Sequence, residues 1–125
     1  LRAKTGETIR VDFGVGGPNF TSSFHIIGTI FDRVYAAGSF GSPPLTGVQT
    51  VMVAPGSAVV IDLSLPVPGR FLLVDHAFTR MERGLAGALI VDGPPAPEIY
   101  HAGDGSKAAT SLVKEARPRK AKPQR

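Results

Sequence analysis

Hydrophobic and polar residues alternate along residues 8–13, which is the pattern of a strand with one face in a core. Other apolar stretches are short, rich in β-branched and aromatic residues, and separated by glycine and proline. We also expect a short helix within residues 77–85, bounded by Gly84. The pattern predicts an all-β sandwich of about six strands. The expected strands cover residues 8–13, 24–31, 48–54, 58–65, 70–76 and 86–92, with residues 48–54 and 58–65 forming a pair joined by Pro55-Gly56.

The charge divides the chain into residues 1–102 and residues 103–125. The first part has seven Lys and Arg against eight Asp and Glu, and the second has seven against two. We therefore expect one nearly neutral domain followed by a solvated, disordered basic tail, although such a tail also attracts acidic proteins, anionic lipid or nucleic acid. The basic pI belongs to the tail, so it is weak support for nucleic-acid binding. No apolar run approaches the roughly 18 residues that span a bilayer.

The chain has no cysteine, so it supplies no disulfide, zinc ribbon, thiol nucleophile or blue-copper thiolate. A metal bound here needs histidine, carboxylate or methionine ligands. The three histidines are His25, His76 and His101. Because His101 lies beyond the last expected strand, we interpret it as a surface residue on a docking segment.

His25 lies in an apolar run, and His76 ends the strand expected over residues 70–76. Their wide separation in the sequence matches no local metal motif. One interpretation is that each is an ordinary, partly buried histidine with one hydrogen-bond partner. The other is that strand ends place both imidazoles at one rim of the sandwich, where imidazole suits copper binding and proton donation near neutral pH. Two histidines do not complete a copper or zinc site, so this second interpretation needs ligands from another chain.

Several segments of the chain resemble the second domain of copper-containing nitrite reductases. The resemblance covers roughly residues 1–100 and is most specific around His25 and His76. The segments that carry it are residues 13–28 (FGVGGPNFTSSFHIIG), 31–35 (FDRVY), 37–44 (AGSFGSPP), 48–50 (VQT), 74–76 (VDH) and 84–89 (GLAGAL).

This resemblance implies a cupredoxin-like Greek-key β-sandwich and an oxidoreductase. Members of the family are trimers of subunits with two cupredoxin domains, and they reduce nitrite to nitric oxide and water in denitrification. A type 1 copper in the first domain transfers the electron. Nitrite binds at a type 2 copper between subunits, which takes two histidines from one subunit's first domain and a third from the neighbour's second domain.

By the same resemblance, His76 stands at the position of that third type 2 copper ligand. His25 stands at the position of the catalytic histidine, which donates a proton to nitrite, and we expect an acid optimum for activity. Ile27 matches the aliphatic residue that crowds the copper and restricts how nitrite coordinates. Gln49 and Thr50 match the pair whose backbone and hydroxyl groups fix the ring of the catalytic histidine.

The family's first domain has no counterpart in this sequence. The type 1 ligands, two type 2 ligands and the active-site aspartate belong to that domain, and none of the chain's own aspartates replaces the last by motif. We therefore expect a light chain or C-terminal fragment of a dissimilatory, NO-forming enzyme, either cut between its domains or encoded in two pieces. It would be active only when assembled with a chain that carries the first domain. A small redox protein, either a cupredoxin or a cytochrome c, is the expected electron donor, and the expected location is the periplasm.

Two other functions compete with this one. The first is a metal-free, cupredoxin-like module that binds a partner. The second is a domain of another multicopper oxidase, such as a laccase. Those oxidases place a cysteine within a dense His-Cys-His cluster, and this chain has neither the cysteine nor the cluster.

Overall fold

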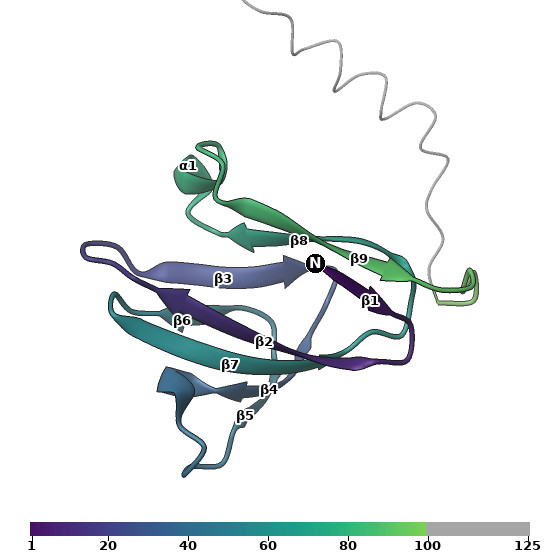
Figure 1. The fold of residues 1–125 in the computed structure, drawn as a ribbon, viewed down its shortest axis with the longest axis horizontal. Coiled ribbons are helices and arrows are strands. Elements are labelled where there is room, and N and C mark those ends of the chain that lie inside the picture. The colour runs from purple at the N-terminus through teal and green to yellow at the C-terminus, as the bar shows by residue number, and fades with distance from the viewer. Residues whose placement is uncertain (100–125) are drawn as a thin grey trace, which may run out of the picture.

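Two β-sheets pack face to face in the computed structural model, which describes residues 1–99 (Figure 1). His101 and the expected tail over residues 103–125 lie outside the described residues. A short 3-10 helix, η1 (Ala36–Gly38), and a short α-helix, α1 (Phe78–Met81), interrupt the strands. The five-stranded sheet has the order β1 (Arg2–Lys4), β9 (Ala86–Asp92), β8 (Gly69–Asp75), β3 (Ser22–Ile27) and β6 (Val51–Val53), and the four-stranded sheet has the order β2 (Thr8–Val15), β7 (Ser57–Ser64), β4 (Phe31–Tyr35) and β5 (Leu45–Val48).

The core lies between the two sheets and takes alternate residues from each strand. In β3, Phe24 and Ile26 are buried against it. The rings of Phe13, Phe24 and Phe31 stack in series, with centroid separations of 4.1 Å and 6.1 Å. Burying a side chain of this size contributes about 1.5–3 kcal/mol. The core therefore fixes which face of β3 points out of the sandwich.

The sequence pattern predicts one strand over the apolar run of residues 24–31, and this prediction is wrong. It divides into β3 and β4, which belong to different sheets, and the chain turns at Gly28. Gly28 has a φ of +92°, a left-handed conformation that side chains with a Cβ rarely adopt. A Cβ at this position would also lie 3.2 Å from the ring of Phe71. The turn therefore requires glycine there, which a count of apolar residues does not reveal.

The prediction that residues 48–54 and 58–65 pair with each other is also wrong. β6 pairs with β3, whereas β7 pairs with β2 and β4 in the other sheet. The Pro55-Gly56 turn therefore carries the chain from one sheet to the other. Alternation within each segment is the same for a hairpin and for this crossing, because both place alternate residues in the core.

The expected fold class is confirmed, whereas the expected number of strands is too low. The structure is a cupredoxin-like β-sandwich with a short helix between β8 and β9. It contains nine strands in the described residues rather than about six, because β1, β4 and β5 were not expected as separate strands. β1 pairs in parallel with β9, far away in the sequence. No helix within residues 1–99 is long and apolar enough to cross a membrane.

Candidate functional site

β3 and β8 place His25 and His76 on the same side of the five-stranded sheet. In the antiparallel pair, His25 lies opposite Val74 and Ile27 lies opposite Leu72. Strand alternation puts these four side chains on the face that points away from the core. His76 occupies the next position on that face, and its backbone N–H continues the ladder by donating to the Ser23 carbonyl at 2.9 Å. We call this side the outer face of the five-stranded sheet.

The ring of His25 is held by the backbone that follows β5. Its Nδ1 lies 2.6 Å from the carbonyl oxygen of Gln49. Because a carbonyl oxygen only accepts, Nδ1 carries the hydrogen whether the ring is neutral or charged. The proton that the ring gains or loses is therefore on Nε2. His25 is only 6% exposed, and its ring is 6.3 Å from that of Phe31, so its orientation is tightly constrained.

The two imidazoles form a stacked pair. Their centroids are 5.5 Å apart, and their planes differ by 17°. Unlike His25, His76 is exposed, with the ring of Phe78 standing edge-on to it at 6.0 Å. One ring is thus fixed and nearly buried, while its neighbour is accessible from outside. An ordinary structural role explains His25 alone, but it gives no reason for an exposed second imidazole stacked beside it.

The other expected site residues lie around this pair. Ile27, two positions along β3 from His25, is 45% exposed although it is a large apolar residue within a sheet. Gln49 is exposed, and its backbone carbonyl contacts the ring of His25. Thr50 is partly buried between Gln49 and the start of β6. The fold therefore gathers Ile27, Gln49 and Thr50 near His25.

The outer face carries several exposed hydrophobic side chains around the histidines. Contiguous exposed apolar surface commonly marks a site where another protein binds. Met52 lies opposite Ser23 in the pairing of β6 with β3, and it is 77% exposed. The other exposed hydrophobic residues on or beside this face are Ile27, Leu72 and Phe78.

The described residues do not form a complete metal site. No group of three or more His, Cys, Asp or Glu within residues 1–99 is arranged to hold a metal ion. An exposed imidazole such as that of His76 is nevertheless a suitable copper ligand. The donors present within residues 1–99 are thus suited to one part of a copper site and do not complete it.

A buried carboxylate beside His76 was not among the residues singled out from the sequence. Asp75 is 2% exposed and accepts hydrogen bonds from Ser22 Oγ at 2.8 Å and from the Ala77 N–H at 2.9 Å. Burial by itself raises the pKa of Asp75, but these bonds, that of the Ser23 N–H and the charge of Arg80 hold it below its ordinary value. An aspartate at a buried strand end was the available signal, since a buried carboxylate needs partners.

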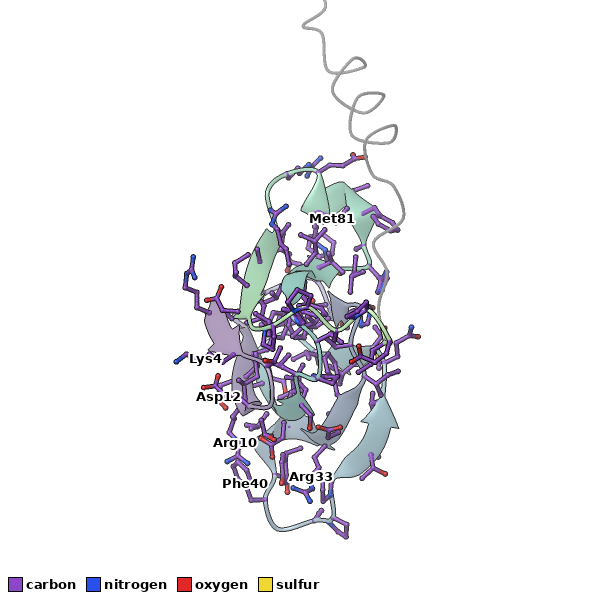
Figure 2. The ribbon with its side chains drawn as sticks, turned by 90° about the vertical axis from the view of Figure 1, so that its right-hand side faces the viewer. Lys4, Arg10, Asp12, Arg33, Phe40 and Met81 are labelled. Carbon is purple, nitrogen blue, oxygen red and sulfur yellow. The ribbon has the colours of Figure 1, made fainter. Side chains whose placement is uncertain are left out.

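A second charged cluster lies on the four-stranded sheet, not on the sheet that carries the histidines. Arg10 donates two hydrogen bonds to Asp62, at 2.7 and 2.8 Å, and its guanidinium lies over the rings of Tyr35 and Phe40. The hydrogen bonds from Arg10 lower the pKa of Asp62. Figure 2 shows Arg10 and Phe40 at the end of the molecule opposite Met81 of α1. This cluster is therefore a separate, structural feature of the four-stranded sheet.

Comparisons with known proteins support the resemblance. The chain is 41% identical to a copper-containing nitrite reductase of Neisseria meningitidis, over 89% of the chain and 31% of that relative. Among solved structures, a copper nitrite reductase from Nitrosomonas europaea matches 78% of the chain with a TM-score of 0.70 and 35% identity. A copper-containing nitrite reductase from Thermus scotoductus matches 77% of it with a TM-score of 0.69 and 31% identity. These matches cover 34% and 23% of the two solved chains.

The chain spans about 30% of the length of these curated relatives. A multicopper oxidase structure also matches 74% of the chain, with a TM-score of 0.66 and 26% identity, and the match covers 32% of that structure. No model of a known protein family matches. The sequence identity therefore favours the nitrite reductases over the multicopper oxidase that the sequence left as an alternative.

Proposed function

The chain is a homologue of one part of the copper-containing nitrite reductases, and from this premise we propose that it is the second cupredoxin domain of such an enzyme. In this proposal it reduces nitrite to nitric oxide when assembled with a chain or domain that carries the type 1 copper. It contributes His76 to a type 2 copper shared across the interface. The whole reaction consumes one electron and two protons for each nitrite and releases water.

The stacked pair of His25 and His76 carries the proposal. One imidazole is exposed and able to bind a metal, while the other lies beside it at 5.5 Å with its Nδ1 already engaged. A metal ligand and a proton donor need this kind of proximity, because both act on the same small substrate. The absence of a three-ligand cluster from residues 1–99 is consistent with a site that is completed by another polypeptide.

His25 has the features of a proton donor. Since Gln49 holds Nδ1–H in both protonation states, the proton available to a substrate is the one on Nε2. The carbonyl also fixes the ring, so its donor atom does not need to reorient during the reaction. In the proposed role, the protonated ring donates Nε2–H to the nitrite oxygen that leaves as water.

His76 and Ile27 have complementary roles in this proposal. His76 would be one of the residues that hold the copper, which when bound would supply Lewis-acid polarisation of nitrite and a redox centre for its reduction. A ligand nitrogen has to be deprotonated, so acid weakens this contact. Ile27 projects partly exposed from the same face, where its branched side chain limits the space available to nitrite.

The outer face is the proposed docking surface for the chain with the first domain. Its histidines need additional ligands, and its hydrophobic side chains, including Met52 and Leu72, would be covered by that partner. The trimeric assembly, the small redox protein as electron donor and the periplasmic location belong to this proposal as well. They rest on the resemblance to the family.

Purification of the native complex through this chain tests the proposal. A mass spectrum of the intact complex gives the subunit stoichiometry, elemental analysis gives the copper count, and an electrode measures nitric oxide formed from nitrite with an artificial reductant. We expect a companion cupredoxin chain, bound copper and nitric oxide. The His76→Ala variant should lose part of the copper, whereas Thr8→Ala on the exposed edge of β2 should match the wild type.

A complex without copper would contradict the proposal and favour a metal-free interaction module. Copper with oxygen reduction and no nitric oxide would favour a multicopper oxidase instead.

A further inference from the structure

The segments that carry the two histidines are tied together beneath the outer face. β3 begins at Ser22, three residues before His25, and β8 ends at Asp75, directly before His76. Asp75 accepts a hydrogen bond from the Ser22 hydroxyl at 2.8 Å and a longer one from the Ser23 N–H at 3.3 Å. A single buried carboxylate thus contacts both segments.

Arg80 completes this link from the helix that follows His76. Its Nη2 donates to the Thr21 carbonyl at 2.6 Å and lies 3.2 Å from Asp75 Oδ2. Its guanidinium is also 5.8 Å from the ring of Phe20. Arg80 therefore joins α1 to the chain just before β3, and it supplies the positive charge that the buried Asp75 requires.

The stretch between Asp75 and Arg80 is short and contains His76. Its start is fixed by the Asp75 carboxylate, which also accepts the Ala77 N–H at 2.9 Å. Its end is fixed by Arg80 on Thr21. The exposed ring of His76 packs against the outer-face rings of His25 and Phe78, and the anchors on either side add to the constraint on where it lies.

We propose that Asp75 and Arg80 are positioning residues that hold His76 in register with His25 and so set the spacing of the two imidazoles. The expected effect of these two residues on copper retention rests on the proposed function. Their expected effect on the position of His76 does not depend on it. Residues that orient a metal ligand commonly change metal affinity about 10–100-fold when they are lost. The two residues act through His76 and do not themselves contact the substrate.

The test uses the whole protein, metal-free and with 13C-labelled histidine. The measurement is the nuclear Overhauser effect between the ring protons of His25 and His76, which reports their proximity. We expect it in the wild type and in Arg83→Gln, a control on an exposed residue of the same segment. In Arg80→Gln we expect this nuclear Overhauser effect to be lost. In Ser22→Ala, which removes only the hydroxyl bond to Asp75, we expect a weaker effect than in the wild type. Ser22→Ala is the milder change and replaces Arg80→Gln if that variant folds poorly.

Folded Arg80→Gln and Ser22→Ala variants that keep the wild-type ring contact would overturn the proposal and leave the cluster a merely structural one. Copper titration of the same variants assembled with the chain that carries the first domain is the second readout, and we expect affinity to fall about tenfold or more in Arg80→Gln. The two claims fail separately. A wild-type assembly that binds no type 2 copper contradicts the proposed function, while the ring contact still decides whether Asp75 and Arg80 position His76.

Discussion

The imidazole rings of His25 and His76 lie nearly parallel, with centroids 5.5 Å apart and planes 17° apart, although His25 lies in β3 and His76 directly follows β8. Only His25 has its Nδ1 held by a backbone carbonyl, and only His76 is exposed. This asymmetry suggests different functions for the two rings. The first prediction separates them.

Replacing each histidine by alanine should have distinct effects in the assembled enzyme. His76→Ala should lose type 2 copper, because it removes a ligand. His25→Ala should keep copper but lose about 100-fold or more in turnover, since general acid catalysis contributes that much. Copper analysis and nitric oxide formation between about pH 5 and about pH 8 measure both effects. Full copper in His76→Ala, or wild-type turnover in His25→Ala across that range, would exclude the role assigned to that residue.

Neighbouring isoleucines of β3 provide a matched pair. Ile26 is fully buried, whereas Ile27 is 45% exposed on the outer face. Ile26→Ala should lower the free energy of unfolding by about 2–5 kcal/mol, as other buried truncations do. Ile27→Ala should lower it by no more than about 1 kcal/mol but change the KM for nitrite. Urea unfolding and steady-state kinetics compare the two. A large loss of stability in Ile27→Ala with unchanged kinetics would make it an ordinary core residue.

The contact of Gln49 with His25 uses the backbone, so its side chain should be dispensable. We expect Gln49→Ala to retain turnover near that of the wild type with an unchanged pH profile. Thr50→Val, which keeps the side-chain shape but removes the hydroxyl, should reduce turnover if that hydroxyl helps to fix the ring. Equal loss of activity in both variants would show that the Gln49 side chain has a role the structure does not reveal.

The Arg10–Asp62 pair predicts an acid-dependent loss of stability that is independent of the site. Its hydrogen bonds lower the pKa of Asp62 in the folded state, while an unfolded aspartate titrates near pH ~3.9. The contribution is therefore fully present above that value and is lost as the pH falls through the folded pKa. Urea unfolding at about pH 6 and about pH 3 should show a smaller acid-induced loss in Asp62→Asn than in the wild type.

Asp92→Asn is the control for that experiment, because Asp92 pairs with Arg2 at an exposed position, and such pairs contribute little. Its free energy of unfolding should fall as much on acidification as that of the wild type does. If Asp62→Asn loses as much stability in acid as the wild type does, a carboxylate other than Asp62 causes the acid-dependent loss of stability.

The sequence predicts strands that lie within one sheet and are bounded by turn residues, and it fails where the chain changes sheets. Residues 8–13 and 86–92 lie in β2 and β9 as expected. The pattern does not distinguish one sheet from the other, so the break at Gly28 and the crossing at Pro55-Gly56 were missed. Both depend on contacts between distant residues, such as the ring of Phe71 against Gly28.

The candidate site was found through the resemblance rather than from spacing. Nothing local in the sequence brings His25 to His76, because their proximity comes from the pairing of β3 with β8. The Asp75–Arg80 cluster was missed for a related reason. Its partners, Thr21 and Ser22, come from the start of another strand, and burial of Asp75 is a property of the folded sheet.

The most direct test of the shared site is anomalous diffraction at the copper edge from crystals of the assembled protein. The account predicts a copper peak at a contact between polypeptides, about 2.0–2.1 Å from a ring nitrogen of His76, as in metal–imidazole bonds. It also predicts that Nε2 of His25 faces the substrate position beside that peak. Rings of both histidines that face away from every subunit boundary, with no peak near His76, would contradict it.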